Sequence, residues 1–352
     1  MTMQHTAVGL ILCTGAVLTV VVLDFLTQRF AGNRASAQNA AAGTPHKTSN
    51  GRSRRRWSGG ARSRRRRTTL ALARTGLALA ERAAPGLGAR AAVRMLMTLP
   101  RAVPGRGADA VPDGDRQRVD LPGSAPSSIV TEAWGEGPAV YMLHGWGADR
   151  TSWRRFVGPL TRAGFRAVTL DAPGHGDSGP GAYGPGRTLL PEMITALRAA
   201  AGHHGPAHAV VAHSMGGLAA AVACLDGLDA ARLVLIAPMP DVPSAIRVFA
   251  EAAGAGERIR ARMPRALEQL VRVPLSHFDA VQRSAEEETL PAALVIHDGG
   301  DRKVPFGLGA RLAAAWPCAR LHVTRGLGHH RILHDDGVIA ASLDFLVAGA
   351  GC

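Results

Sequence analysis

The stretch Val210-Val-Ala-His-Ser-Met-Gly-Gly217 decides the fold of this 352-residue chain. An apolar run leads straight into small residues around Ser214, and a helix-forming run follows. This pattern predicts a strand that turns sharply into a helix and exposes the serine hydroxyl at the turn. Small neighbours are required because the strand and the helix approach closely there. Ala212 stands where such turns usually carry glycine, so the pentapeptide is a weak signal by itself.

Short apolar runs alternate with helical stretches on both sides of this turn, from about residue 117 onward. The predicted strands are 139–143, 165–170, 207–212, 232–237, 292–296 and 320–324. The predicted helices lie near 151–163, 188–201, 215–228 and 331–348. This alternation predicts an α/β fold with a mainly parallel, doubly wound sheet. Such sheets place their chemistry at the carboxyl ends of the strands.

One connection between predicted strands is unusually long. It runs from near Ala237 to near Ala292 and is helical and basic, with scattered large apolar residues. A connection of this length within a compact domain is either functional or a small subdomain. We expect a small helical cap over about 238–290, with Phe249 and Met263 contacting the substrate. An ordinary helical insertion would have the same sequence pattern.

Three further motifs directly follow predicted strands. They are His144-Gly-Trp-Gly147, Ile296-His-Asp-Gly-Gly-Asp-Arg-Lys-Val-Pro305 and Gly326-Leu-Gly-His-His330. In the first, His144 and Gly145 are expected to contact substrate, and the Trp146 N–H would join the Met215 N–H in an oxyanion hole. Such donors are worth roughly 3–4 kcal/mol each in a transition state. The second motif supplies a carboxylate and the third an imidazole, which are the groups that activate a serine nucleophile.

A fourth motif, Asp171-Ala-Pro-Gly-His-Gly-Asp-Ser-Gly179, follows the strand at 165–170. With these motifs in this order, residues 118–349 resemble the α/β-hydrolase superfamily. The resemblance implies hydrolysis of carboxylic esters or related acyl bonds through a serine–histidine–aspartate triad, with no metal and no organic cofactor. Thioesterase, amidase and carbon–carbon bond hydrolase activities remain alternatives, because the fold does not determine the substrate.

The family pattern also selects among neighbouring candidate residues. It places the acid three residues before a Val-Pro pair, which implies Asp301 rather than Asp298. It places the histidine directly after a glycine, which implies His329 rather than His330. Ser214 would then be the nucleophile, His329 the base and Asp301 its acid partner. An alternative of another class, a non-catalytic binding module with the same fold, is disfavoured because this triad is intact.

Positive charge is concentrated at the N-terminus. Residues 1–68 hold twelve Lys and Arg residues against one acid, so most of the formal net charge of +14 lies there. Residues 7–26 form an apolar run as long as one bilayer crossing, and arginines follow it rather than precede it. We therefore predict a transmembrane anchor within 1–31 and a cytoplasmic catalytic domain at a bacterial-type inner membrane. The alternatives are a cytoplasmic protein with a functionless extension over 1–68, and an export signal beginning at Ser63.

The remaining segments complete the predicted organisation. Residues 32–67 read as a disordered Arg-rich linker, 68–116 as a leading helical segment broken near Pro85-Gly86, and 117–352 as the catalytic domain. The expected partners are a small-molecule acyl substrate and, through the N-terminus, a membrane. Nucleic acid is not expected, since binding would have to come from the arginine runs of residues 52–67 alone. The sequence leaves the oligomeric state open.

Overall fold

The computed structural model describes residues 58–100, 111–123 and 127–348 of the chain. They form two compact units. Among the described residues, the first unit comprises 58–92 and 249–263, and the second comprises 93–248 and 264–348. The predicted triad, the strands and the helices that flank them belong to the second unit.

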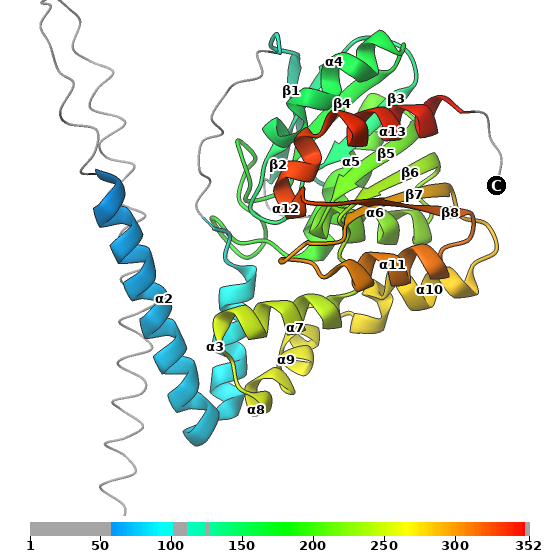
Figure 1. The fold of residues 1–352 in the computed structure, drawn as a ribbon. Coiled ribbons are helices and arrows are strands. Elements are labelled where there is room, and N and C mark those ends of the chain that lie inside the picture. Colours follow the sequence, from blue (N-terminus) through cyan, green and yellow to red (C-terminus); the bar gives the residue numbers. More distant parts are fainter. Residues whose placement is uncertain (1–57, 101–110, 124–126, 349–352) are drawn as a thin grey trace, which may run out of the picture. The chain divides into compact units, whose positions relative to one another are not determined.

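The second unit is built on an eight-stranded sheet in the order β1-β2-β4-β3-β5-β6-β7-β8 (Figure 1). The strands are β1 Asp115–Asp120, β2 Ser128–Trp134, β3 Ala139–Leu143, β4 Arg166–Asp171, β5 Ala207–His213, β6 Ala230–Ile236, β7 Ala292–Asp298 and β8 Ala319–Thr324. Strand β2 pairs antiparallel with β1 and β4, and the pairs from β4 through β8 are parallel. The predicted mainly parallel sheet is confirmed.

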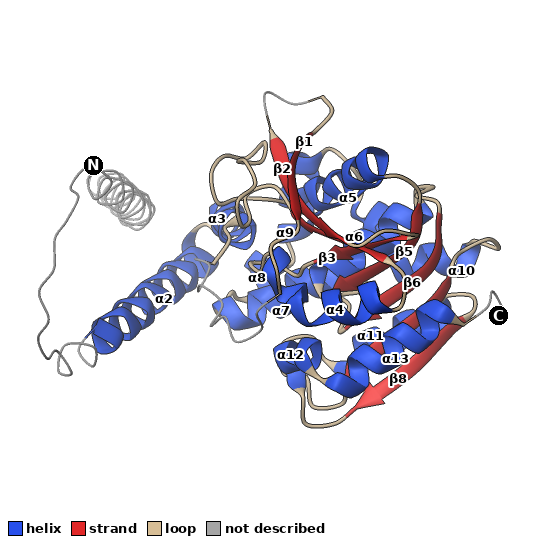
Figure 2. Cartoon of the chain, turned by 90° about the horizontal axis from the view of Figure 1, so that it is seen from above, coloured by secondary structure: helices blue, strands red, loops and turns tan. Residues whose placement is uncertain are grey.

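Helices cover both faces of this sheet (Figure 2). One layer contains α4 Arg154–Arg162, which follows the 3-10 turn η1 Arg150–Trp153, and α13 Asp336–Val347. The other contains α5 Leu190–His204, α6 Met215–Leu225, α10 Ala280–Glu286 and α11 Phe306–Ala315. The core beneath α4 and α13 is formed by alternate strand residues, including Val140, Met142, Val211, Val234 and Ile296. Both faces of the central strands are buried, as expected of parallel strands between helices.

The six predicted strands correspond to β3 through β8, whereas β1 and β2 were not predicted. Strand β1 reads Asp-Arg-Gln-Arg-Val-Asp, and Val119 is its single buried residue. Its partner β2 is almost wholly buried but has Glu132 in its centre. Neither segment shows the apolar run or the clean alternation that predicts a strand, because pairing at the edge of the sheet stabilises them instead.

The insertion between β6 and β7 is helical, as predicted. It contains α7 Val242–Ala253, α8 Glu257–Arg260, α9 Met263–Val271, the 3-10 turn η2 Leu275–Phe278 and α10. Residues 249–263 belong to the first unit, whereas η2 and α10 pack on α6 within the second. The later part of the predicted cap is therefore part of the helical layer over the sheet.

The first unit joins helix α2 Ser58–Ala83 and the part of helix α3 Pro85–Met97 up to Ala92 to residues 249–263. The Glu81 carboxylate accepts the N–H groups of Arg258 (2.7 Å) and Ile259 (3.0 Å) in the first turn of α8. A carboxylate at a helix N-terminus pairs with otherwise unsatisfied N–H groups. The break between α2 and α3 falls at Ala84, since proline is favoured at the first position of a helix. Helix α2 begins at Ser58, inside the stretch predicted as linker.

The membrane prediction is corrected by the structure. Among residues 58–100, 111–123 and 127–348, no helix is both long and apolar enough to cross a bilayer. Helix α2 has 26 residues but carries Arg74, Glu81 and Arg82 besides an arginine run. This finding contradicts the predicted transmembrane helix and inner-membrane localisation. The predicted span over 7–26 and residues 32–57 of the predicted linker lie outside the described residues.

The turn between β5 and α6 requires a glycine at position 216. A Cβ atom there would lie 2.7 Å from the carbonyl oxygen of Leu143 and against that of His144. Both oxygens belong to the backbone where β3 ends, so they have little freedom to move aside. The sequence predicted that small residues around Ser214 allow a close approach of backbone segments. In the structure, Gly216 allows α6 to approach the end of β3.

We predict that Gly216→Ala lowers the free energy of unfolding by at least roughly 2 kcal/mol, because overpacked backbone contacts cannot relax. The control is Gly202→Ala in α5, where an added Cβ meets no atom within 4 Å. Alanine should leave stability unchanged there or raise it by about 0.5–1 kcal/mol. Urea unfolding of both variants measures the difference, and equal stabilities would contradict the proposed steric constraint.

Candidate active site

Ser214 lies at the sharp turn between the end of β5 and the start of α6. Its φ of 56° and ψ of −119° are strained for a residue with a side chain. Hydrogen bonds hold this conformation: Ser214 N–H donates to the Ile236 carbonyl (3.0 Å), and the Ser214 carbonyl accepts from Met239 N–H (3.1 Å). Strand β6 and the loop after it therefore fix the backbone of the serine.

Ser214, His329 and Asp301 form one hydrogen-bonded chain. His329 Nε2 lies 2.9 Å from Ser214 Oγ, and His329 Nδ1 lies 2.7 Å from Asp301 Oδ2. Asp301 follows β7, and His329 lies in the short helix α12 Gly328–Arg331 after β8. All three residues are less than a tenth exposed. This geometry lets the imidazole accept the serine proton while the carboxylate holds its tautomer.

Asp301 is held in its ionised form. Burial alone would raise the pKa of this carboxyl, but the nearby His297 ring, the hydrogen bond with His329 and the charge of His329 lower the pKa well below its usual range. The second carboxylate oxygen accepts the N–H groups of Lys303 (2.7 Å) and Val304 (3.0 Å). A carboxylate with this many donors remains an acceptor for the imidazole.

The two neighbouring candidates have other partners. Asp298 accepts hydrogen bonds from Thr324 Oγ1 (3.0 Å) and Leu327 N–H (2.9 Å), so it fixes the loop that leads to α12. His330 Nε2 lies 2.7 Å from the Lys303 ammonium. Of each predicted pair, the structure brings Asp301 and His329, and not Asp298 and His330, to the serine.

The loop after β3 lies against the serine. A Cβ added to Gly145 would lie 3.1 Å from Ser214 Cβ. Among the described residues, the N–H groups of Trp146 and Met215 have no hydrogen-bond acceptor. Free N–H groups beside a serine could stabilise negative charge that develops on a substrate oxygen.

His144, predicted to contact substrate, has a different role. Its side chain is fully buried, Nε2 accepts the Ala172 N–H (3.0 Å), and Nδ1–H donates to the Gly145 carbonyl (2.8 Å). Both ring nitrogens are thus used within the protein. His144 positions the loop after β3, and its buried ring has no nitrogen free for a substrate, which corrects the prediction.

His175 supports the same loop from the other side. Its Nε2 accepts the Gly147 N–H (3.1 Å), and its ring lies 4.6 Å from that of His144. Burial, aided by His144, lowers the pKa of His175 to about 3. Both histidines are therefore neutral, which is what lets Nε2 accept backbone N–H groups.

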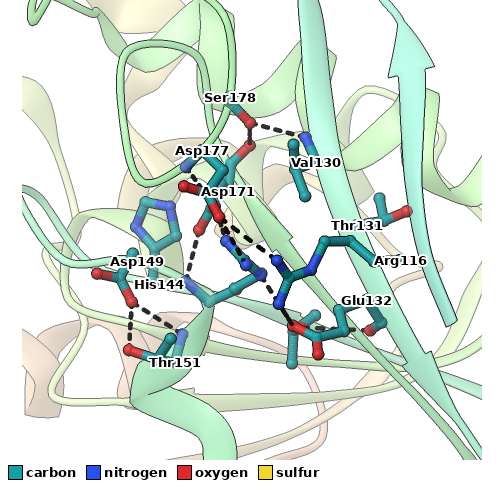
Figure 3. A network of polar contacts seen from close by, with 12 residues as sticks. Arg116, Val130, Thr131, Glu132, His144, Asp149, Thr151, Asp171, Asp177 and Ser178 are labelled. Carbon is teal, nitrogen blue, oxygen red and sulfur yellow. Dashed lines mark hydrogen bonds and ion pairs between the residues drawn. The ribbon is translucent and has the colours of Figure 1, made fainter. Parts of the chain in front are cut away.

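The carboxylates of Glu132, Asp171 and Asp177 gather next to this loop (Figure 3), and the buried Arg150 bonds to all three. Arg150 Nε donates to Glu132 (2.9 Å), one terminal nitrogen donates to Asp171, and the other donates to Asp177 (2.8 Å). Asp171 also accepts the backbone N–H groups of Arg150 (2.7 Å) and Asp177 (2.9 Å). Burial alone would lower the pKa of Arg150, but these carboxylates raise it. The network joins β2, η1 and the loop after β4 into one rigid support.

His213 is a residue of the site that the sequence analysis did not assign. Its Nε2–H donates to the backbone carbonyl of His329 (2.9 Å), and the two rings lie 4.7 Å apart. The ring is buried, and burial and the nearby charge of His329 lower its pKa far below the ordinary value. In the sequence, only its position directly before Ser214 indicated that His213 belongs to the site. Its contact with His329 could not be predicted, because the two residues are more than a hundred positions apart.

The predicted cap residues lie outside this cluster. Phe249 is half-buried on α7, and Met263 is fully buried at the start of α9. Both belong to the first unit, whereas Ser214 belongs to the second. Their contact with substrate stays a prediction.

Comparison with known proteins places the chain in a family. The profile of the alpha/beta hydrolase family matches residues 140–341, which is more than half of the chain. The matched range contains Ser214, Asp301 and His329.

The matches to two curated relatives extend over most of the length of those proteins. The chain is 28% identical over 265 residues to a 2-hydroxy-6-oxo-6-phenylhexa-2,4-dienoate hydrolase of Burkholderia cepacia, covering 61% of this chain and 90% of that protein. The same values describe its match to a 2-hydroxy-6-oxononadienedioate/2-hydroxy-6-oxononatrienedioate hydrolase of Comamonas testosteroni. Among solved structures, a bromoperoxidase from Bacillus anthracis has a TM-score of 0.51 at 19% identity, covering 66% of this chain and 100% of that one. This last likeness shows the fold alone.

We predict that acid destabilises the protein through His175. Its pKa is about 3 in the folded chain and about 6.5 in the unfolded chain, so the unfolded state binds the proton first as pH falls. Stability is therefore lost as pH falls below about 6.5, by about 2 kcal/mol between pH 7 and pH 5 for this group. Urea unfolding at both pH values should show a smaller loss, by about that amount, for His175→Gln. An identical loss in both proteins would contradict this assignment.

A second prediction concerns His213. Replacement by leucine removes the donor to the His329 carbonyl and should slow modification of Ser214 by a fluorophosphonate by about tenfold to a hundredfold. His213→Gln places a donor near the position of Nε2 and should restore the rate to within a few-fold. Melting temperatures identify any variant that is merely unfolded. If the folded leucine and glutamine variants react equally fast, His213 does not position His329.

Proposed function

The chain belongs to the α/β-hydrolase family, and from this premise we propose that it cleaves a carbon–carbon bond next to a ketone through an acyl-enzyme on Ser214. Hydrolase activity follows from the family and from its named relatives. The hydrogen-bonded chain of Ser214, His329 and Asp301 is the observation that carries the proposal. The names of the relatives support the choice of bond. The two relatives matched over 90% of their length are named as hydrolases of 2-hydroxy-6-oxo-dienoates or the corresponding dienedioates.

In the proposed mechanism, His329 accepts the proton of Ser214 as the serine oxygen attacks the ketone carbon. Asp301, ionised and bonded to Nδ1, stabilises the imidazolium that forms. The N–H groups of Trp146 and Met215 would donate to the oxyanion. Removal of one such donor typically costs a factor of about 10² to 10³ in rate.

The bond that breaks next joins the former ketone carbon to the neighbouring carbon. Carbon is a poor leaving group unless its electron pair is delocalised. In the 2-oxo-3-enoate tautomer of a 2-hydroxy-6-oxo-dienoate, the pair passes through the double bond to the 2-oxo group, and the fragment leaves as a dienolate. The dienolate takes the proton from the imidazolium of His329, which is thereby neutral again. His329 then activates water, which hydrolyses the ester on Ser214 and releases a carboxylic acid.

Hydrolysis of a carboxylic ester is the second candidate. It uses the same nucleophile, base and oxyanion donors, and an alkoxide leaves where the dienolate would leave. The sequence prediction placed esters first and carbon–carbon bonds among the alternatives. The relatives named above reverse that order.

The test is a comparison of two substrates on the full-length protein and on Ser214→Ala. One is 2-hydroxy-6-oxo-6-phenylhexa-2,4-dienoate, whose hydrolysis releases benzoate, and the other is p-nitrophenyl butyrate. We expect faster turnover of the dienoate, measured as kcat/KM, and loss of at least about 10³-fold in Ser214→Ala. A fluorophosphonate should label the wild type at Ser214.

Each outcome has a distinct meaning. Faster turnover of the ester alone would favour an esterase over a carbon–carbon bond hydrolase. A folded protein that resists labelling and turns over neither substrate would overturn the serine-hydrolase proposal and favour a non-catalytic binding module.

A further inference from the structure

The loop after β7 carries a lysine whose ammonium group contacts His330, the residue directly after His329 of the candidate triad. We propose that Lys303, held by His330, binds a carboxylate of the substrate. This inference rests on the proposed function, since it concerns the substrate of the same serine, and it assigns a role to two residues that the mechanism above does not use.

The position of Lys303 is set by the triad itself. Its backbone N–H donates to Asp301 Oδ1 (2.7 Å), while the other oxygen of Asp301 bonds to His329. Its ammonium lies 2.7 Å from Nε2 of His330, the residue directly after His329. The rings of His330 and His329 lie 5.1 Å apart. The position of Lys303 is therefore fixed by contacts with two loops, the one after β7 that carries Asp301 and the one after β8 that carries His329.

His330 acts as a neutral acceptor for this ammonium. Partial burial, followed by the positive charge of Lys303, lowers the pKa of His330 to about 4. A neutral imidazole can accept the lysine N–H at Nε2 without cancelling its charge. The pair consequently carries one positive charge.

No carboxylate neutralises that charge within the described part of the chain. No ion pair involves Lys303 among these residues, and the carboxylate of Asp301 is fully buried with both oxygens occupied. His330 uses one of the three donors of the ammonium, which leaves two for another acceptor. Both side chains are exposed, so an incoming ligand can reach them.

A small carboxylate fits this arrangement. It would gain a charge-assisted hydrogen bond from the ammonium and would face no competing anion. Lysine presents a compact point charge on a flexible stem, so it can contact His330 and a carboxylate simultaneously. The site therefore favours substrates that carry a carboxylate near the reacting carbonyl over neutral substrates of equal size.

The test uses the full-length protein and two matched aryl esters, p-nitrophenyl butyrate and the mono-p-nitrophenyl ester of glutaric acid. They differ chiefly in the terminal carboxylate. The measured quantity is the ratio of kcat/KM for the acidic ester to that for the neutral ester. We expect Lys303→Met to lower this ratio about tenfold and Lys303→Arg to keep it within about threefold, as expected for one charge-assisted contact.

Arg302→Met is the matched control, because it removes an exposed positive charge from the neighbouring position on the same loop. It should change the ratio less than about twofold if position, and not overall charge, matters. Added salt should also lower kcat/KM for the acidic ester of the wild type more than for the neutral one.

The outcomes separate this inference from the proposed function. If the wild type reacts with a fluorophosphonate at Ser214 but Lys303→Met leaves the ratio unchanged, the inference is overturned and the serine hydrolase stands. Equal losses in Lys303→Met and Arg302→Met would also overturn it, in favour of a diffuse charge effect. A wild type without labelling at Ser214 would remove the proposed function itself.

Discussion

The turn at Ser214 is the constraint on which the rest of the site depends. Helix α6 starts within contact distance of the backbone that ends β3, and only a glycine at position 216 permits this approach. In the same turn Ser214 has a positive φ, and hydrogen bonds to Ile236 and Met239 hold it there. The strained backbone presents the serine hydroxyl at the carboxyl end of β5, where Oγ lies 2.9 Å from His329 Nε2.

Neutral histidines form much of the support around this turn. His144 and His175 accept backbone N–H groups in the loops after β3 and β4, and His213 donates to the backbone of His329. Burial keeps His144, His175 and His213 uncharged by lowering their pKa values. Imidazole groups therefore have two roles in the site. His329 contacts the serine, whereas the buried histidines form hydrogen bonds that hold the scaffold in place.

Charge is distributed unevenly around the triad. The carboxylates near the loop after β3 are paired with Arg150, and Asp301 is occupied by His329 and backbone N–H groups. Lys303 has no such partner among the described residues, and its side chain is exposed with the ammonium 2.7 Å from Nε2 of His330. An exposed positive charge is thus present next to His330, whereas the buried carboxylates are paired or hydrogen-bonded within the scaffold. A dienoate and an acidic ester share the negative charge that this arrangement would attract.

The sequence by itself determined the sheet from β3 to β8 and the turn at Ser214, since each lies in a local apolar pattern. It placed candidate acids and histidines after apolar strands, and the resemblance to the α/β-hydrolase superfamily selected Asp301 and His329 among them. It did not reveal β1 and β2, because edge pairing stabilises strands that are polar or lack clean alternation. It also missed the contacts of His213, Arg150 and Lys303, and it assigned His144 to the substrate. The tertiary structure alone decided these roles, because each depends on atoms brought together from distant parts of the chain. Neither composition nor spacing shows which side chains will form hydrogen bonds with one another.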